Sequence, residues 1–447
     1  MHYDIVIIGG GTAGWLSAAY LSFKNPNKQI CLIESPDIPT IGVGEGTFPT
    51  TMKLLSSIGI TPEEMIVKTN GGLKVGIKYI DFADKDFWLT TEPHWEHFGS
   101  DLVKTVGNLN KSPVLSNEVF FGCHFVASEL ADLLKQYSTK SSVTHISANI
   151  VSSTVINNTC FDVTTDTGLN ITGSWFIDCS GFARLLTKQT TSKFKSYDNE
   201  LLVDSAVVGQ LPYTNFDKEF VSYTQITARP AGWQFKIPTF KRTGNGYVYS
   251  SKFTSSEDAE ALLKETTGVA NVKHIKMQLG YYQTLVNGNI ISVGLSGGFI
   301  EPLEATAIHI SEQTLQQFQK MLDGDINAED ANNYMSNKIR YIKTLILGHY
   351  AFSQRTDDFW VKAKECAFNS LEIQEFFKNL KNGQYPTADD TLDEAYPYGQ
   401  WNELLKGFNL PHYYPHINSE AKKQIFMASY YLPEHSKYIK QLRIVNE

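Results

Sequence analysis

The sequence predicts an α/β protein: a Rossmann-like nucleotide-binding module of the GR2 type, an antiparallel β-sheet inserted into it, and a helical C-terminal module. Three observations predict this arrangement. A glycine-rich turn follows the first apolar segment, alternating segments rich in Tyr, Phe and Thr occupy residues 70–110 and 200–285, and helical periodicity begins at Ser311. We therefore expect residues 1–310 to form the nucleotide-binding module with its inserted sheet, and residues 311–447 to form the helical module.

The first predicted element is a strand over residues 3–8. It leads directly into a turn with the pattern Gly-x-Gly-x-x-Gly, and residues 15–21 then have helical character. Such glycines permit a tight turn and a close approach of the backbone, so that a pyrophosphate can lie at the N-terminus of the helix. A merely glycine-rich turn is the alternative. The residues expected to contact the nucleotide here are Gly9, Gly11, Thr12, Ala13 and Gly14.

A second strand over residues 29–33 follows the helix and leads to Glu34. An acid at this place binds the ribose hydroxyls of an adenosine. Strand, glycines, helix, strand and acid in this order predict a nucleotide-binding βαβ unit more specifically than the glycine pattern does alone.

Two later strands favour FAD as the nucleotide. Residues 172–178 end at Asp178, and residues 289–294 end at Gly294 and continue with Leu295 into a predicted helix. In many FAD-binding proteins such strand ends close around the cofactor, although an ordinary strand-to-helix turn is the alternative for each. The sequence contains no second Gly-x-Gly-x-x-Gly. We therefore expect a separate NAD(P)H-dependent flavin reductase to supply reduced flavin, while noting that some hydroxylases bind nicotinamide without such a motif.

Composition limits the classes of partner and the compartment. A net charge of −8 and a pI near 5.8 argue against nucleic acid or an anionic membrane as a partner. Five scattered cysteines form no CxxC pair and no Cys/His cluster, so we expect reduced thiols and no metal site. An early first strand and the lack of a stretch of about 20 apolar residues predict a cytoplasmic protein with neither signal peptide nor membrane span. The oligomeric state stays open.

Five motifs, taken together, resemble the tryptophan-halogenase family of flavoenzymes. They occupy residues 9–15, 38–46, 232–238, 246–251 and 298–306, in the family's order, and the resemblance extends from residue 1 to about 365. The third motif, GWQFKIP, is similar to the family signature GWxWxIP.

This resemblance implies a reaction and its cofactors. FAD, as FADH2, with O2 and a halide ion would give hypohalous acid, which a tunnel would deliver to a lysine for halogenation of an electron-rich, indole- or phenol-like substrate. The resemblance also implies flavin contacts from Gly42, Val43, Gly44 and Glu45.

The lysine that the resemblance selects is Lys74, in a predicted strand over residues 71–79. Alternation places Leu73 and Tyr79 on one face and Lys74 and Lys78 on the other. Without the family, a solvated strand face is the preferred interpretation. The amine would either hydrogen-bond the hypohalous acid or accept its halogen as a haloamine, and the sequence leaves both open.

The acid partner that the resemblance implies is Glu304, expected in the first turn of a helix that begins at Pro302. Its family role is to hydrogen-bond the hypohalous acid or to accept the proton that the ring loses, and stabilising the helix dipole is the alternative. Thr306 and Ala307 match the family's halide site, where backbone N–H groups near a helix start hold the anion. The family often has glycine at the position of Ala307, and the backbone donors survive this change.

Trp233, Phe235 and Ile237 alternate along the strand of the GWQFKIP motif and therefore share one face. In the family these side chains separate the flavin from the substrate, and core packing is the alternative. Phe235 replaces the second tryptophan of the signature and keeps most of its bulk.

The substrate pocket is the least specific part of the resemblance. The matching residues are His97 and Phe98, which would sandwich the ring, and Trp360, Tyr396 and Trp401 from the helical module, which would cover the pocket. These matches are loose, and His97 lies closer to Phe98 than the spacing in enzymes that act on free tryptophan. Such departures argue against a pocket dedicated to free tryptophan.

Two other functions stay open from the sequence. A single-component FAD-dependent aromatic hydroxylase would share flavin and O2, but it would need neither Lys74 nor Glu304 and would oxidise NAD(P)H unaided. A non-catalytic flavin-binding protein would have no reason to retain Lys74, Glu304 and the aromatic face of GWQFKIP together.

Overall fold

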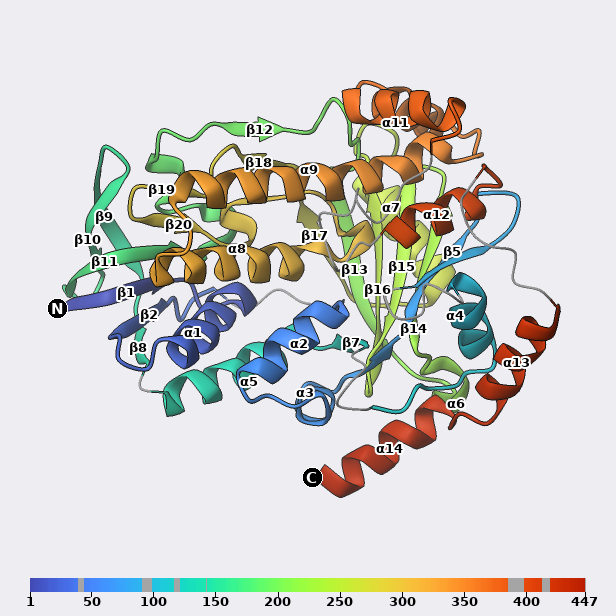
Figure 1. Ribbon diagram of the computed structural model, residues 1–447, viewed down its shortest axis with the longest axis horizontal. Helices are drawn as coiled ribbons and strands as arrows, with labels where there is room; N and C mark the ends of the chain where they lie inside the picture. The colour runs from blue at the N-terminus through green and yellow to red at the C-terminus, as the bar shows by residue number, and fades with distance from the viewer. Residues whose placement is uncertain are drawn as a thin grey trace.

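The computed structural model describes residues 1–38, 44–90, 99–115, 121–141, 143–384, 398–411 and 419–446. Two large sheets lie side by side, and the long helix α9 (Ala328–Phe352) extends from one toward the other (Figure 1). The functional residues lie between these two sheets and on the helices that join them.

The first sheet is the predicted nucleotide-binding sheet. Its order is β19-β20-β11-β1-β2-β8, with the hairpin β9–β10 added beside β11. Its strands are β1 (His2–Ile8), β2 (Ile30–Glu34), β8 (Thr144–Ser147), β9 (Ile150–Ile156), β10 (Thr159–Thr165), β11 (Asn170–Asp178), β19 (Val286–Asn287) and β20 (Ile290–Ser292). Strand β1 pairs in parallel with both β2 and β11, and β11 pairs in parallel with β20. The four strands predicted from the sequence are therefore confirmed, and their carboxyl ends meet at one edge.

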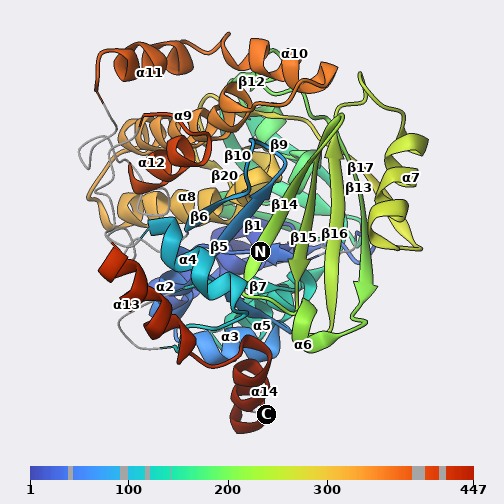
Figure 2. The same ribbon diagram turned by 90° about the vertical axis from the view of Figure 1, so that its right-hand side faces the viewer.

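The second sheet is the predicted inserted sheet, in the order β17-β13-β16-β15-β14-β5-β6. Its strands are β5 (Gly76–Ile80), β6 (Phe87–Thr90), β13 (Ser205–Pro212), β14 (Tyr223–Arg229), β15 (Gly232–Pro238), β16 (Arg242–Tyr249) and β17 (Val272–Lys276). The pairing is antiparallel, as predicted, except that β14 and β5 are parallel. Helix α7 (Ser256–Thr267) covers the outer face at the β17 end (Figure 2).

Two small sheets connect the large ones. They consist of β3 (Glu45–Gly46), β7 (Gly122–Phe125) and β4 (Gly72–Lys74), and of β12 (Phe194–Ser196), β18 (Gly280–Tyr282) and β21 (Gly298–Phe299). The prediction of one continuous strand over residues 71–79 is wrong. The chain changes sheets at Val75, whose N–H donates to the carbonyl oxygen of Ser222 at 2.8 Å, so β4 and β5 belong to different sheets.

The helices of the N-terminal half are α1 (Thr12–Lys24), α2 (Pro49–Ser57), α3 (Pro62–Lys68), α4 (Gly99–Asn108), α5 (Ala127–Lys140) and α6 (Phe216–Glu219). Helix α1 packs on the first sheet and against α5, whereas α4 packs against β6 of the second sheet. Short 3₁₀ helices follow strand ends: η2 (Gly181–Ala183), η3 (Thr187–Gln189), η4 (Gly294–Ser296) and η5 (Pro302–Glu304). A helix was predicted after residue 294, and the single turn of η4 takes that place.

The C-terminal part is helical, as predicted. Its helices are α8 (Thr306–Asp323), α9, α10 (Asp358–Ala367), α11 (Leu371–Lys381), α12 (Tyr398–Gly407), α13 (Ser419–Tyr430) and α14 (His435–Asn446). Helix α8 runs through residue 310, and α14 returns to pack against α3 and α6 (Figure 1). Ile439 of α14 is fully buried in the same apolar cluster as residues of α1 and β1. The division at residue 310 stays a prediction.

Two further observations concern the chain as a whole. All five cysteines are free and buried, in agreement with the expected reduced thiols. Within the described ranges, no helix combines the length and apolar character that crossing a membrane would require.

Candidate active site

The N-terminus of α1 forms the predicted cradle. A Cβ atom at Gly14 would lie 1.8 Å from the carbonyl oxygen of Gly9, and Gly9 itself adopts a φ of +108° with Cys179 close by. Both positions therefore require glycine. Gly11 differs, because a Cβ atom placed on it would have no described atom within 4 Å beyond its own chain neighbours. The space in front of Gly11, at the start of α1, fits the pyrophosphate of a dinucleotide.

Glu34 ends β2 beside this cradle, as predicted. Its carboxylate lies 2.9 Å from Nε2 of His145 and 3.3 Å from Nζ of Lys135, and Nε1 of Trp15 donates to it at 3.4 Å. A Cβ atom on Gly10 would overlap the carboxyl group, so this glycine lets the acid approach the cradle. The carboxylate stays partly exposed, as a ribose ligand must be.

Asp178 ends β11 at the same edge. Its carboxylate is buried and accepts hydrogen bonds from the loop that follows. It accepts hydrogen bonds from Ser180, from the N–H of Leu186, and from both the N–H and the hydroxyl of Thr187, at 2.6–3.0 Å. Its carbonyl oxygen accepts a hydrogen bond from Ser296 of η4. Asp178 thereby holds two loops of the cradle in place.

Gly294 and Leu295 lie in η4, directly against α1. Gly294 has a φ of +71°, and a Cβ atom there would lie 2.9 Å from the Cβ of Ala13. Glycine at this position lets η4 approach the start of α1. Thr12 is the first residue of that helix.

The segment after β2 reaches the inserted sheet. Gly44 has a φ of +122°, and a Cβ atom on it would lie 3.5 Å from a methyl group of Ile237. Burial raises the pKa of Glu45, the next residue, to about 7. Gly42 and Val43 lie outside the described residues.

Lys74 ends β4 and is completely buried, which removes the alternative of a solvated strand face. Gly122 lies opposite Lys74 in the strand ladder, and a Cβ atom on Gly46 would lie 3.3 Å from the amine. The amine lies 4.9 Å from the centre of the Phe48 ring and has no hydrogen-bond partner among the described residues. Burial lowers the pKa of Lys74 to about 8, against the opposing influence of Glu304. At pH 7, about one unit below this pKa, about one such amine in ten is neutral.

His124 lies on β7 beside Lys74 and is also fully buried. Its Nε2 atom is 2.8 Å from the hydroxyl of Thr224. Burial, with the neighbouring Lys74 and His435, holds the pKa of His124 well below its usual range. His124 therefore adds no positive charge to the surroundings of the amine.

Glu304 ends η5, with 1% of its surface exposed. The hydroxyl of Tyr79 donates a short hydrogen bond to Oε1, and Nε2 of His349 lies 3.1 Å from the same oxygen. Glu304 lies in the first turn of a helix that begins at Pro302, as predicted, and this helix is the single 3₁₀ turn η5. Ala305, in the left-handed region at a φ of +53°, separates η5 from α8.

Thr306 and Ala307 are the first residues of α8, as the halide site requires. Thr306 is buried, and its hydroxyl has no hydrogen-bond partner in the part of the chain that the structure describes. A buried donor at the positive end of a helix fits an anion.

The aromatic face of β15 lies against α9. Nε1 of Trp233 donates to the hydroxyl of Tyr350 at 3.1 Å, and this hydroxyl donates to Oε1 of Glu301 at 2.8 Å. Burial raises the pKa of Glu301 to about 8. Phe235 is buried beside Trp233, with ring centres 6.4 Å apart. Both rings pack in the core, and they also form the surface that Ile237 extends toward Gly44.

Comparison with known proteins identifies the family. The sequence model of the family described as tryptophan halogenase matches residues 4–110 and 103–423. The chain belongs to the tryptophan halogenase family. Members are flavin-dependent enzymes that act on an aromatic substrate and take reduced flavin from a separate reductase, so the predicted enzyme class is confirmed.

Individual relatives agree along nearly the whole chain. The 7-chloro-L-tryptophan 6-halogenase KtzR of Kutzneria sp. is 30% identical over 80% of this chain and 81% of the relative. The tryptophan 7-halogenase RebH of Lentzea aerocolonigenes is 29% identical, over 92% and 88%. The crystal structure of the tryptophan 6-halogenase SttH from Streptomyces toxytricini superposes with a TM-score of 0.88 at 26% identity, covering 98% of this chain and 99% of that one. The predicted fold class is thereby confirmed.

The residues expected in the substrate pocket of this tryptophan halogenase family member divide into two groups. Trp360 and Trp401 are buried in the helical core: Nε1 of Trp360 donates to the carbonyl oxygen of Arg229 at 2.8 Å, and the Trp401 ring lies 4.2 Å from that of Phe376. Both have structural roles in this arrangement. His97, Phe98 and Tyr396 lie outside the described residues.

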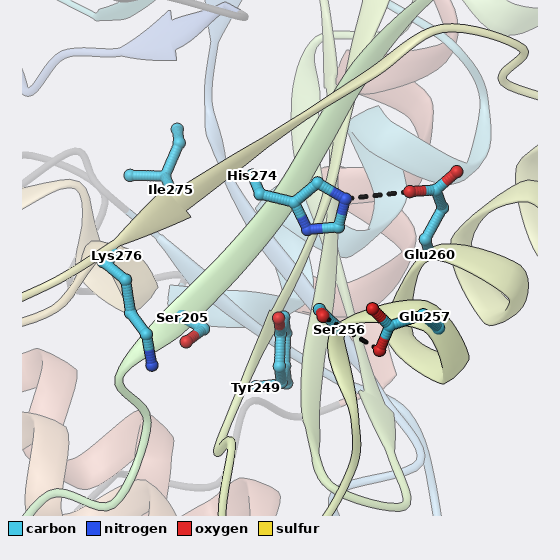
Figure 3. A pocket seen from close by; sticks show the side chains of 8 residues that line it. All are labelled: Ser205, Tyr249, Ser256, Glu257, Glu260, His274, Ile275 and Lys276. Carbon is cyan, nitrogen blue, oxygen red and sulfur yellow. Dashed lines mark hydrogen bonds and ion pairs between the residues drawn. The ribbon is translucent and has the colours of Figure 1, made fainter.

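A surface pocket lies at the β17 edge of the inserted sheet (Figure 3). Tyr79, the partner of Glu304, lies on β5 toward the opposite edge of this sheet. Two of the pocket's charged groups pair within the lining, Glu260 with His274 at 2.8 Å, and Lys276 pairs with Asp204 outside the lining at 3.4 Å. Glu257 accepts a hydrogen bond from the hydroxyl of Ser256 at 3.0 Å. The pocket lining is Ser205, Tyr249, Ser256, Glu257, Glu260, His274, Ile275 and Lys276.

Sequence reasoning missed several buried residues that lie beside the two predicted catalytic groups or beside the aromatic face of β15. His349 and Tyr350 lie in a helix whose periodicity indicates only core packing, and Tyr79 was assigned to a strand face without a role. Glu301 lies three residues before Glu304 in the same motif, so the sequence did show a second acid close to the predicted one. His124 gave no signal, because a lone histidine in an apolar segment has no recognisable pattern.

Proposed function

We propose that this protein is an FADH2-dependent halogenase that halogenates an electron-rich aromatic compound of the indole or phenol type, with Lys74 presenting the halogen and Glu304 accepting the proton that the ring loses. The observation that carries this proposal is a buried, unpartnered lysine amine that is electrostatically coupled to a buried carboxylate. Structural roles rarely leave a lysine amine buried and unpartnered, because the desolvation of the charge costs free energy.

The cradle residues would hold FAD. Gly9, Gly11 and Gly14 give the pyrophosphate access to the start of α1, and Glu34 would bind the ribose hydroxyls. Gly44 and Glu45, with Gly294 and Leu295, would contact the flavin end. When bound, reduced flavin with O2 and halide supplies hypohalous acid.

The start of α8 would hold the halide ion. Thr306 and Ala307 offer backbone N–H groups at the positive end of a helix of 18 residues, and the unpartnered hydroxyl of Thr306 adds a donor. The same donors suit chloride, bromide and iodide.

The oxidant would then travel past the aromatic face of β15 to Lys74. Trp233, Phe235 and Ile237 would separate the flavin from the aromatic substrate, so that the substrate meets halogen and not flavin. A neutral Lys74 amine would take up the halogen, and an ammonium would hydrogen-bond the hypohalous acid. A pKa of about 8 makes both forms available near neutral pH.

The substrate class follows from the chemistry of the site and from relatives. Electrophilic halogen attacks electron-rich rings, and the named relatives are tryptophan halogenases, so an indole or a phenol is the expected class. Of the pocket residues expected from the sequence, Trp360 and Trp401 pack in the helical core, so His97, Phe98 and Tyr396 remain as candidates.

A competition assay tests this function. Purified protein with FAD, NADH and a separate flavin reductase would be incubated with indoles and phenols in a mixture of chloride, bromide and iodide, and products would be read by mass spectrometry. We expect halogenated product from the wild type, and none from Lys74→Ala although FADH2 is still oxidised. Lys78→Ala is the matched control, because Lys78 is close by in the sequence but forms a surface ion pair with Asp86 at 3.1 Å.

The outcomes separate the alternatives. Halogenation by Lys74→Ala at the wild-type rate would overturn the role of this lysine. Hydroxylated product, with NADH consumed in the absence of the reductase, would identify a single-component hydroxylase. Bound flavin without oxidation would indicate a protein with no turnover.

A further inference from the structure

His349 lies on α9 in direct contact with Glu304, and the hydrogen bonds of its ring restrict its protonation. Nδ1 is 3.0 Å from the carbonyl oxygen of Leu345, one helical turn earlier. A carbonyl oxygen only accepts hydrogen bonds, so Nδ1 must carry a proton. The neutral form of His349 would therefore have a bare lone pair on Nε2.

Nε2 lies 3.1 Å from Oε1 of Glu304, and both residues are buried. A bare nitrogen and a carboxylate oxygen are both acceptors, and two acceptors in contact away from water repel each other. A proton must therefore lie between them, either on Nε2, giving an imidazolium beside a carboxylate, or on Glu304, giving a neutral acid beside a neutral imidazole.

The function of Glu304 distinguishes these two states. A neutral acid cannot accept the proton that the ring loses, whereas a carboxylate can. The hydroxyl of Tyr79 donates to the same Oε1 atom, which favours the ionised carboxylate. Among the described residues, the other titratable groups that face this pair are Tyr79 from β5 and the Lys74 amine from β4, which is electrostatically coupled to Glu304.

We propose that His349 is a positioning residue for Glu304: an imidazolium, protonated on both nitrogens, that keeps the buried carboxylate ionised and oriented as a base. This inference rests on the proposed function. In the final step the C–H bond of the halogenated carbon breaks, its electron pair returns to the ring, and the proton passes to Glu304. His349 keeps its own proton throughout, and its positive charge stays 3.1 Å from Oε1 before and after the transfer.

The protonation state can be measured without turnover. In protein labelled with ¹⁵N-histidine and free of substrate, the ring signals that disappear in His349→Gln belong to His349. We expect both nitrogens to be protonated at pH 7, and we expect Glu304→Gln to turn the ring neutral, because it removes the negative partner. A bare Nε2 in the wild type would overturn the proposal.

The second measurement is the pH profile of kcat for halogenation. His349→Gln retains an N–H donor but removes the positive charge beside the carboxylate, so the acid limb of the profile should move to higher pH by about one to three pH units. Tyr79→Phe is the matched control, since it removes an uncharged donor from the same oxygen and should move the limb less. A purely structural role would lower the rate without moving the limb.

The outcomes of the two proposals can be told apart. If the wild type halogenates and the His349→Gln profile superimposes on the wild-type profile, the inference fails and the proposed function stands. If the wild type halogenates no arene while His349 is doubly protonated, the proposed function fails and the ion pair stands.

Discussion

Lys74 lowers the stability of the fold at neutral pH because its charged amine is buried, whereas the proposed reaction needs this amine at the same place. Burial lowers the pKa of its amine from 10.5 to about 8, so between these values the unfolded chain binds a proton that the folded protein does not. Stability therefore increases as pH rises through this window and is lowest below about pH 8, where the folded protein carries a buried ammonium.

Lys74→Met should consequently raise the melting temperature at pH 7, and the gain should shrink as pH rises from about 8 to 10.5. Thermal unfolding at pH 7, 9 and 10.5 measures this dependence. Lys78→Met is the control and should show little change, because Lys78 is partly exposed. An equal gain at all three pH values would contradict the assignment of the effect to the charge.

Two glycines of the cradle should respond differently to one added methyl group. Gly14→Ala places a Cβ atom 1.8 Å from the carbonyl oxygen of Gly9, so it should destabilise the apoprotein. Gly11→Ala meets no described atom within 4 Å and should leave the apoprotein stable, while it weakens FAD binding by occupying the space of the pyrophosphate. Melting curves and flavin titration, side by side, check both expectations. Unchanged FAD affinity in Gly11→Ala would place the cofactor elsewhere.

At the scale of elements, α9 connects Glu304 with the aromatic face of β15. Its adjacent residues His349 and Tyr350 contact Glu304 and Glu301, and Tyr350 also accepts the hydrogen bond of Trp233 from β15. One helix therefore contacts both the proposed base and the aromatic face.

Tyr350→Phe tests this connection. It removes the buried hydroxyl that accepts from Trp233 and donates to Glu301, so we expect a loss of about 2 kcal/mol in the free energy of unfolding, measured with urea. Tyr334→Phe, on the same helix, removes a half-buried hydrogen bond of 2.9 Å to Gln313 and should cost about 1 kcal/mol or less. Equal losses in the free energy of unfolding would show that the hydrogen bonds to Trp233 and Glu301 stabilise the protein no more than the bond to Gln313 does.

The sequence predicted those elements whose pattern is local. The strand, the glycine turn and the helix of residues 3–21 could be predicted, because backbone geometry requires a local pattern of apolar residues and glycines for each of them. The break at Val75 and the left-handed Ala305 could not be predicted, since each depends on the partner that a distant segment supplies. His349 and Tyr79 were missed for the same reason: they come from α9 and β5, and only tertiary packing brings them to Glu304.

At the scale of the whole molecule, the last helix packs into a core built by the N-terminal half of the sequence. His435 of α14 is fully buried against Phe220 and bonds Ser112 at 3.1 Å, and the guanidinium of Arg443 donates to the carbonyl oxygen of Val67. Helix α14 therefore contacts α3 and α6, although it is far from them in sequence.

Deleting residues 435–447 should therefore lower the melting temperature strongly, because it uncovers apolar surface around Ile439. Deleting residues 444–447 alone should have little effect, since Ile444 and Val445 are about four-fifths exposed. Thermal unfolding of the two truncated proteins compares them. A stable protein without α14 would support an independent N-terminal domain.

The burial of all five cysteines has a consequence for handling this protein. Thiols are among the groups that electrophilic halogen attacks fastest, and none lies on the surface where escaping oxidant would meet it. A reagent such as a maleimide should react slowly with the native protein for the same reason. One cysteine introduced at an exposed position would then be a unique attachment point, through which the protein could be immobilised on a support next to its reductase.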